Sequence, residues 1–185
     1  MTLQIERQLF TVEEYHKMAE AGIIKPSDRV ELIHGEVLKR SPIKSPHASV
    51  VDYLNETIGF LLHGKAIIRV QNPIEINHDS EPEPDIAIVQ CKADRYRDHH
   101  PTAEDVFLLI EVADSSLEFD REVKMPLYAS AKIPEAWIIN LPEQRVEVYR
   151  NPEKGQYKLT ELFFLDDTLP VPGFGVQLSV RDIFG

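Results

Sequence analysis

Three apolar segments between residues 84 and 141 decide the fold expected for this chain. They read Pro84-Asp85-Ile86-Ala87-Ile88-Val89, Val106-Phe107-Leu108-Leu109-Ile110-Glu111-Val112 and Glu135-Ala136-Trp137-Ile138-Ile139-Asn140-Leu141. Apolar runs of this length are typical of buried strands. Residues 120–129, between the second and third segments, have the pattern of a helix. The order strand, strand, helix, strand predicts an α/β fold with a mixed central sheet and flanking helices.

Glu111 is the residue of this stretch that most needs an explanation. It stands in an otherwise wholly apolar strand, and an ionised carboxylate buried there is costly unless a cation or a hydrogen-bond donor meets it. Asp85 begins the preceding strand. If the two strands are neighbours, both carboxylates meet at one end of the sheet and can face a common cation. Mg²⁺ prefers one or two such carboxylates together with water and substrate phosphate.

Length and composition are those of an ordinary globular protein. The 185 residues, with 43% hydrophobic and 28% charged side chains, fit one domain spanning residues 1–185. A single cysteine, Cys91, cannot form an internal disulfide, so a reducing interior is the default. The first twenty residues mix charged with apolar side chains, and no run approaches the ~20 apolar residues that span a bilayer. We therefore expect a cytoplasmic protein without membrane contact.

The net charge of −11 argues against a protein that grips nucleic acid over a broad surface, because phosphate binding needs Lys and Arg. It does not exclude a metal-dependent nuclease, whose clustered carboxylates are held for a cation. A solvated acidic surface that keeps the protein soluble accounts for the charge equally well.

The rest of the chain shows several further elements. Thr11 and Glu14 form a capping box that begins a helix ending near Glu20. His34-Gly35 is a two-residue hairpin signal. The other expected elements are a long helix from about His47 to Gly64, strands 66–70 and 74–76, an exposed loop 91–105, a hairpin of 145–150 with 157–161, and a closing strand or helical turn over 176–184. The adjacent pair His99-His100 in the loop is by itself a poor metal signal.

The motif residues resemble a known nuclease core. Pro84-Asp85, Glu111-Val112, Asp120 and Lys124 look like the PD-(D/E)XK pattern, and more narrowly like the Uma2 family of restriction-endonuclease-like proteins. The resemblance runs from about Thr11 to the C-terminus. It implies a restriction-endonuclease-like core with added β-hairpins, and Mg²⁺- or Mn²⁺-dependent hydrolysis of nucleic acid, with DNA the expected substrate.

The resemblance also implies roles for particular residues. Asp85, Glu111 and the Val112 carbonyl would bind the metal, and Lys124 would act with Asp85 and Glu111 in catalysis. The superfamily's lysine normally stands two residues after the glutamate, but position 113 is Ala113; the Uma2 resemblance moves the lysine to Lys124. It adds Glu36 as a further metal ligand and His47 as a neighbour of the site.

The helix over residues 120–129 makes that relocation geometrically possible. Asp120, Lys124 and Tyr128 are spaced by four, so each lies roughly 40° around the helix from the last and all three can face Glu111. Pro126 removes a backbone donor and crowds the preceding turn. Either the helix is kinked there or it begins after Asp120. We expect a charged Lys124 that orients water and stabilises developing charge, with general base the second choice.

Other interpretations explain the same residues. Glu111 and Lys124 could form a purely structural ion pair, and the chain could be an inactive nuclease fold kept as a binding or assembly module, as the charge and Ala113 favour. A hydrolase of small phosphate esters is a third interpretation and predicts a closed, narrow pocket. Cutting both strands of a duplex needs two sites, so a nuclease of this kind would act as a homodimer.

Overall fold

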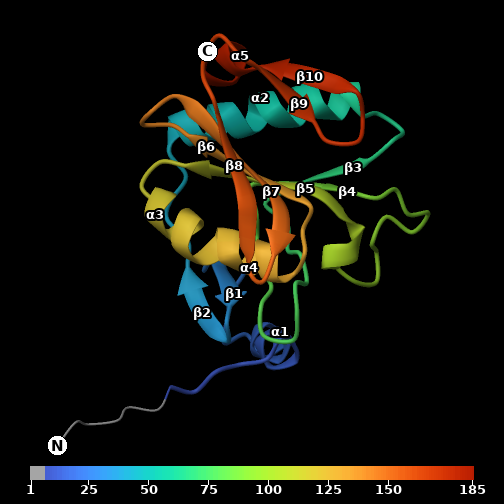
Figure 1. The fold of residues 1–185 in the computed structure, drawn as a ribbon. Coiled ribbons are helices and arrows are strands. Elements are labelled where there is room, and N and C mark those ends of the chain that lie inside the picture. The colour runs from blue at the N-terminus through green and yellow to red at the C-terminus, as the bar shows by residue number, and fades with distance from the viewer. Residues whose placement is uncertain (1–6) are drawn as a thin grey trace, which may run out of the picture.

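A computed structural model of the chain, described here for residues 7–185, is organised around a six-stranded sheet (Figure 1). Its strands lie in the order β3 (Ile67–Val70), β4 (Ile86–Val89), β5 (Val106–Ala113), β6 (Glu135–Asn140), β7 (Arg145–Glu153) and β8 (Gln156–Phe163). Only β5 and β6 run parallel; each other neighbouring pair is antiparallel. The α/β class with a mixed sheet, of the restriction-endonuclease-like type, is therefore confirmed.

Helices and small hairpins cover both faces of the sheet (Figure 1). The long helix α2 (Ser45–Leu61) lies on one face with the hairpin of β9 (Thr168–Val171) and β10 (Val176–Ser179) and with α5 (Val180–Phe184). The other face carries α3 (Leu117–Phe119), α4 (Met125–Ser130) and the hairpin of β1 (Val30–Ile33) and β2 (Glu36–Lys39). In the described residues no helix has the length and apolar character to cross a membrane.

The alternation of β5 assigns its side chains to these two faces. Leu108, Ile110 and Val112 pack with α2, whereas Leu109 and Ala113 pack with Met125 and Tyr128 of the α4 side. Glu111 shares the second face. The expected neighbour relation of the motif strands is also confirmed, because Ile86 of β4 pairs with Ile110 of β5. Asp85 and Glu111 therefore lie at the same end of the sheet.

The N-terminal elements follow their sequence signals. Helix α1 (Val12–Glu20) begins at Thr11 with both hydrogen bonds of the capping box. The β1–β2 hairpin turns at His34 and Gly35, with φ of 51° and 74°. A Cβ on Gly35 would lie 2.7 Å from Cβ of Leu9, so this position requires glycine for conformation and for space.

Some element predictions need correction. Residues 74–76 do not form a strand: Glu75 makes only an isolated bridge with Thr102, and Ile74 is fully buried in the second core. Helix α2 begins at Ser45, with Pro46 in its first turn, two residues before the expected start. The closing segment contains both a strand and a helix, β10 and α5.

The segment expected as one helix over residues 120–129 is a distorted helix that starts earlier. A single α-helical turn, α3, continues into a π-helical turn over residues 120–124, in which the Met125 N–H donates to the Asp120 carbonyl. Helix α4 then begins with Pro126 in its first turn. A proline needs no backbone donor in that position. The irregularity lies in the turn before Pro126 and is a π-helical turn, whereas a kink at Pro126 was predicted; the alternative of a start after Asp120 is wrong.

Candidate active site

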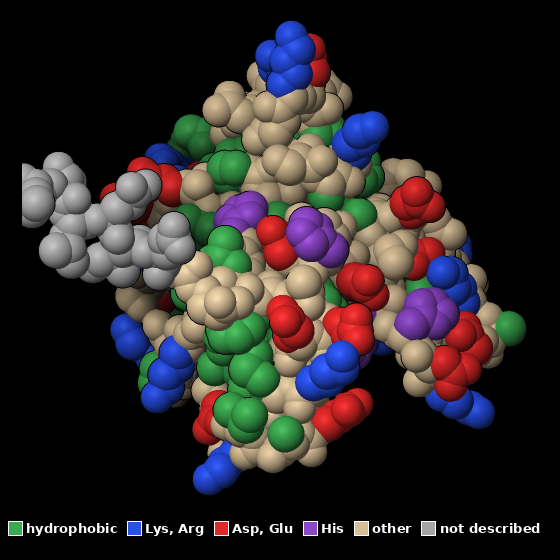
Figure 2. Space-filling view, turned by 90° about the horizontal axis from the view of Figure 1, so that it is seen from below, with side chains coloured by type: hydrophobic (Ala, Val, Ile, Leu, Met, Phe, Trp, Pro, Cys, Tyr) green, Lys and Arg blue, Asp and Glu red, His purple; other side chains and the backbone are tan. Residues whose placement is uncertain are grey.

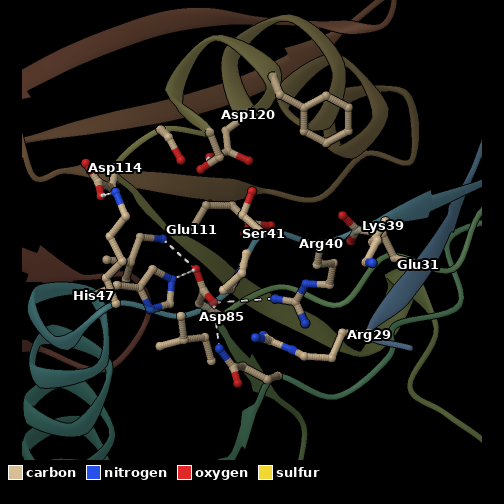
Figure 3. A pocket seen from close by; sticks show the side chains of 18 of the residues that line it. Arg29, Glu31, Lys39, Arg40, Ser41, His47, Asp85, Glu111, Asp114 and Asp120 are labelled. Atoms are coloured by element: carbon tan, nitrogen blue, oxygen red, sulfur yellow. Dashed lines mark hydrogen bonds and ion pairs between the residues drawn. The ribbon is translucent and has the colours of Figure 1, made fainter. Parts of the chain in front are cut away.

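A pocket of about 370 Å³ opens where the motif strands end (Figure 3). The ends of β4 and β5, the distorted helix, the β1–β2 hairpin and the start of α2 all contribute residues to it. Asp85, Glu111, Val112, Asp120, Lys124 and His47 line it, as do Glu31, Arg40 and Gln71. The structure therefore brings together, in one pocket, most of the residues that the sequence singled out.

Asp85 is held by donors from three directions. Its Oδ2 accepts hydrogen bonds from the Val112 N–H at 2.9 Å and from Nε2 of His47 at 3.0 Å, and its Oδ1 accepts from Nε2 of Gln71 at 3.1 Å. Nη2 of Arg40 lies 3.5 Å from Oδ1. Burial opposes the charge of this carboxylate, but His47, the Val112 N–H and Gln71 outweigh it and lower the pKa of Asp85. Asp85 is a fixed anion at neutral pH.

Glu111 lies beneath the distorted helix and contacts two of its side chains. Its Oε1 accepts a hydrogen bond from Nζ of Lys124 at 3.2 Å and from the hydroxyl of Tyr128 at 2.5 Å. Within residues 7–185 the side-chain hydrogen bonds to this carboxylate all reach Oε1, so Oε2 keeps its acceptor capacity for a ligand of the pocket. Tyr128 is fully buried and also orients Glu111.

Lys124 is shared between two carboxylates. Its Nζ lies 3.2 Å from Oε1 of Glu111 and 3.2 Å from Oε2 of Glu31, a residue of β1. Burial disfavours the charged ammonium, but the carboxylates of Glu111 and Glu31 outweigh burial and raise the pKa of Lys124. The structure thus places a charged lysine of the helix beside Glu111.

The pocket holds an excess of buried negative charge. The carboxylates of Glu31, Asp85, Glu111 and Asp120 are buried beside one buried ammonium, Lys124, and the Arg40 guanidinium. Burial, together with the neighbouring charges of Asp120 and Asp85, raises the pKa of Glu111 to about 8 against the opposing charge of Lys124. Burial likewise raises the pKa of Asp120, which accepts a hydrogen bond from Ser116 at 2.7 Å. A bound cation would relieve this imbalance.

The donor set fits a hard divalent cation. Asp85, Glu111 and Asp120 offer carboxylate oxygens, and Mg²⁺ takes one or two of these, completing its shell with water and substrate phosphate. These carboxylates are not gathered into a closed three-ligand cage: within residues 7–185, the one group of three acidic or histidine ligand atoms mutually within 4.8 Å lies elsewhere, at His16, Glu81 and His100. A cation bound here would take part of its shell from water or another ligand.

Glu36 does not lie in the pocket, so its predicted role as a metal ligand needs correction. Its carboxylate pairs with Arg7, and it is not among the residues that line the cavity. Side chains alternate along a strand, and Glu36 sits next to the turn while the opposite strand carries Glu31 toward Lys124. Glu31 is therefore the acidic residue that the hairpin contributes.

Arg40 and Gln71, like Glu31, were not singled out from the sequence. Arg40 donates to Oε2 of Glu83 at 2.7 Å besides its contact with Asp85, and Gln71 adopts a φ of 49° directly after β3. Glu31 could have been identified as a site residue from the sequence, because it is a charged residue in an apolar strand, as Glu111 is. Arg40 and Gln71 lie at strand ends with no such mark.

Basic side chains surround the mouth of the acidic pocket. Arg29, Lys39 and Lys44 line it together with Arg40 (Figure 3), and Nζ of Lys44 pairs with Asp114 at 2.8 Å. These residues come from the β1–β2 hairpin and the loop that leads to α2. A chain with a net charge of −11 thus lines this pocket with as many lysine and arginine side chains as acidic ones.

Comparisons with known proteins agree with this fold. The family model Uma2, described as "Putative restriction endonuclease", matches residues 12–181. A crystal structure from Anabaena variabilis, described as "a putative nuclease belonging to DUF820", superposes with a TM-score of 0.75 at 20% sequence identity, covering 95% of this chain and 97% of that one. At this identity the likeness establishes the shared fold. No curated protein sequence matches the chain.

Proposed function

The chain belongs to the Uma2 family, and from the geometry of its acidic pocket we propose that it is a Mg²⁺- or Mn²⁺-dependent nuclease that hydrolyses phosphodiester bonds in DNA. The observation that carries the proposal is the charged Lys124, held 3.2 Å from both Glu111 and Glu31 in the pocket that Asp85 lines. A purely structural ion pair between Glu111 and Lys124 would require neither a second carboxylate nor a pocket beside it.

Asp85 and Glu111 are the residues proposed to hold the metal, with the carbonyl of Val112 as a further oxygen and Asp120 close by. When bound, the metal would stabilise charge on a phosphodiester oxygen and lower the pKa of water. His47, Gln71 and Arg40 fix the orientation of the Asp85 carboxylate. Tyr128 does the same for Glu111. Neither acidic ligand then has to reorganise when substrate arrives.

Lys124 acts in this proposal as a charged donor. The raised pKa of Lys124 keeps its ammonium protonated at neutral pH, which supports stabilising the pentavalent phosphate and orienting the attacking water. It argues against the second choice, a general base, because a base must first be neutral. Arg29, Lys39 and Lys44 at the pocket mouth would position the nucleic acid backbone on either side of the bond to be cut.

The open pocket also bears on the other interpretations. A basic-rimmed mouth favours a polymeric phosphate over a small phosphate ester, for which a closed pocket was expected. The inactive-module interpretation retains one supporting observation, namely that Lys124 already contacts two carboxyl groups that could hold it as a structural ion pair. Cutting both strands of a duplex would require a second pocket, so the proposal includes a homodimer acting on opposite strands.

The proposal is tested by incubating supercoiled plasmid, linear duplex, single-stranded DNA and RNA with the protein in Mg²⁺ or Mn²⁺. Lys124→Met is expected to lower the cleavage rate about 10²–10³-fold, as loss of one preorganised donor does. Glu31→Gln should also impair cleavage, whereas Glu36→Gln, a change of the same kind in the same hairpin, should leave it intact. Equal activity of Lys124→Met and the wild type would remove Lys124 from the mechanism.

A calorimetric Mn²⁺ titration separates metal binding from the choice of substrate. Binding should disappear in Asp85→Ala and in Glu111→Ala, because each removes one of the two proposed ligands, and should persist in Glu36→Gln. If neither variant alters Mn²⁺ binding, and no nucleic acid is cleaved, the inactive-module interpretation takes precedence. Sedimentation of the protein with a duplex substrate is a separate experiment, which tests whether the protein binds the duplex as a homodimer.

A further inference from the structure

His16, Glu81 and His100 meet on the surface away from the acidic pocket. Each offers one ligand atom, and the three atoms all lie within 4.8 Å of one another. Nε2 of His16 is 2.9 Å and 3.1 Å from the two carboxylate oxygens of Glu81. None of the three lines the acidic pocket. The Glu81 side chain is only 2% exposed, whereas His16 is 45% exposed, so an ion from solvent can reach a carboxylate that is otherwise buried.

The three ligands come from segments that are distant in the sequence. His16 lies on α1, Glu81 in the connection between β3 and β4, and His100 in the connection between β4 and β5. Figure 2 views the end of the molecule that carries α1 in Figure 1, and histidine and acidic side chains are among those exposed at that end. His99, the neighbour of His100 in the sequence, does not belong to this cluster. The fold instead brings His100 close to two residues that are distant in the sequence.

We propose that His16, Glu81 and His100 form a binding site for a divalent transition metal of the zinc class, separate from the acidic pocket. Two imidazoles and one carboxylate are a ligand set of Zn²⁺, and three protein ligands leave its fourth tetrahedral position to water. Bond lengths near 2.0–2.1 Å place tetrahedral ligand atoms about 3.3 Å apart. The two distances between His16 and Glu81 are slightly shorter than this value, and the ligand atom of His100 lies no more than 4.8 Å from either partner, so the site closes with small side-chain movements.

The chemistry of the ligands distinguishes this site from the proposed Mg²⁺ site. Imidazole nitrogen suits Zn²⁺, Ni²⁺ and Cu²⁺, whereas Mg²⁺ takes oxygen ligands. The metal would replace the hydrogen bond between His16 and Glu81. Nearby charge is mixed: Glu81 favours a cation, while Nη2 of Arg69, 3.4 Å from Nδ1 of His100, opposes one. Arg69→Gln should therefore tighten metal binding.

A metal bound at this site would link α1 to the rest of the molecule. Only Val12 of this helix is buried, and the other contacts that anchor it include the Val12 N–H to the His78 carbonyl and the Tyr15 hydroxyl to the Val30 carbonyl. Glu81 is also linked to β1, since its N–H donates to the Leu32 carbonyl. Metal bound there would connect α1, the hairpin and both sheet connections at one point.

Calorimetric Zn²⁺ titration of the Asp85→Ala protein, which lacks a ligand of the acidic pocket, tests this site. We expect one Zn²⁺ per chain, retained in a large excess of Mg²⁺. His16→Ala and His100→Ala should each weaken binding by more than the roughly 10–100-fold that loss of an outer-shell partner costs. His99→Ala, the adjacent residue of the same loop, should leave Zn²⁺ affinity unchanged. Full-affinity binding by His16→Ala would overturn the proposal.

Thermal unfolding gives a second measurement that does not depend on catalysis. Free Zn²⁺ at about 100 times Kd should raise Tm by roughly 5–10 °C, and the increase should vanish in His16→Ala. His16 is exposed on a helix, where alanine is well tolerated, so this variant should fold. The cluster would not be a metal site if the Asp85→Ala protein bound no Zn²⁺. The same conclusion would follow if His99→Ala lost as much Zn²⁺ affinity as His16→Ala.

Discussion

Glu111→Gln should make the metal-free protein more stable at neutral pH, although the residue is proposed to be essential for cleavage. The folded state raises the pKa of Glu111 from 4.5 to about 8, chiefly by burial. Between these two pH values the folded state binds a proton that the unfolded state releases, so the wild-type free energy of unfolding falls as pH rises. Gln resembles the protonated acid and removes this loss.

The magnitude follows from the two pKa values. Each pH unit between them changes the free energy of unfolding by about 1.4 kcal/mol. Below pH 4.5 the two proteins should differ only by a constant amount, since Glu111 is then protonated in both states. From pH 5 to pH 7 the advantage of the variant should grow by about 2.5 kcal/mol, or roughly 5–10 °C in Tm for a chain of this length. Above pH 8 it should level off.

Thermal and urea unfolding of both proteins between pH 4.5 and 8.5, in chelator, would measure this difference. Glu147→Gln is a matched control, because Glu147 is also a buried strand carboxylate. Burial opposes its charge, but donors from Arg121, Asn140 and Tyr149 lower the pKa of Glu147 to about 2. That variant should instead be less stable than the wild type by a nearly constant amount across this range, because the unfolded and folded pKa values of Glu147 lie at or below its lower end.

A constant difference between wild type and Glu111→Gln across this pH range would refute the reasoning. It would mean that Lys124 and Tyr128 fully offset the burial of Glu111, and that the pocket has no unbalanced charge for a cation to relieve. Mg²⁺ supplies a further check: it should stabilise the wild type at pH 8 and leave Glu111→Gln unchanged.

Three further changes have distinct expected results. Tyr128→Phe removes a donor to the buried Glu111 and should cost about 1–3 kcal/mol of stability at pH 8 by urea unfolding, with little change at pH 4.5. Gly35→Ala forces a φ of 74° on a residue whose Cβ meets Leu9 and should cost about 1–3 kcal/mol in the same assay. Leu54→Ala empties a fully buried position of α2 and should cost about 2–5 kcal/mol without altering Mn²⁺ affinity.

Much of the fold could be predicted because its signals are local. The capping box at Thr11 and the His34-Gly35 turn depend on neighbouring residues, and each forms as expected. The strand predicted over residues 74–76 does not form, because apolar character alone does not supply a strand partner. Ile74 is buried under the sheet without joining it. The helix that contains Pro126 was predicted only in part. Its irregularity was expected from the proline, but the π-helical turn over residues 120–124 was not.

The sequence by itself determined that Asp85 and Glu111 stand at the ends of buried strands, where an acidic residue needs a cation or a donor. It also marked Lys124 and Tyr128 as residues that one helix could present together. Only the tertiary structure decided that Glu31 rather than Glu36 contacts Lys124, and that His16, Glu81 and His100 meet. Such meetings depend on hairpin placement and loop paths, which are fixed by packing between distant segments and leave no local pattern in the chain.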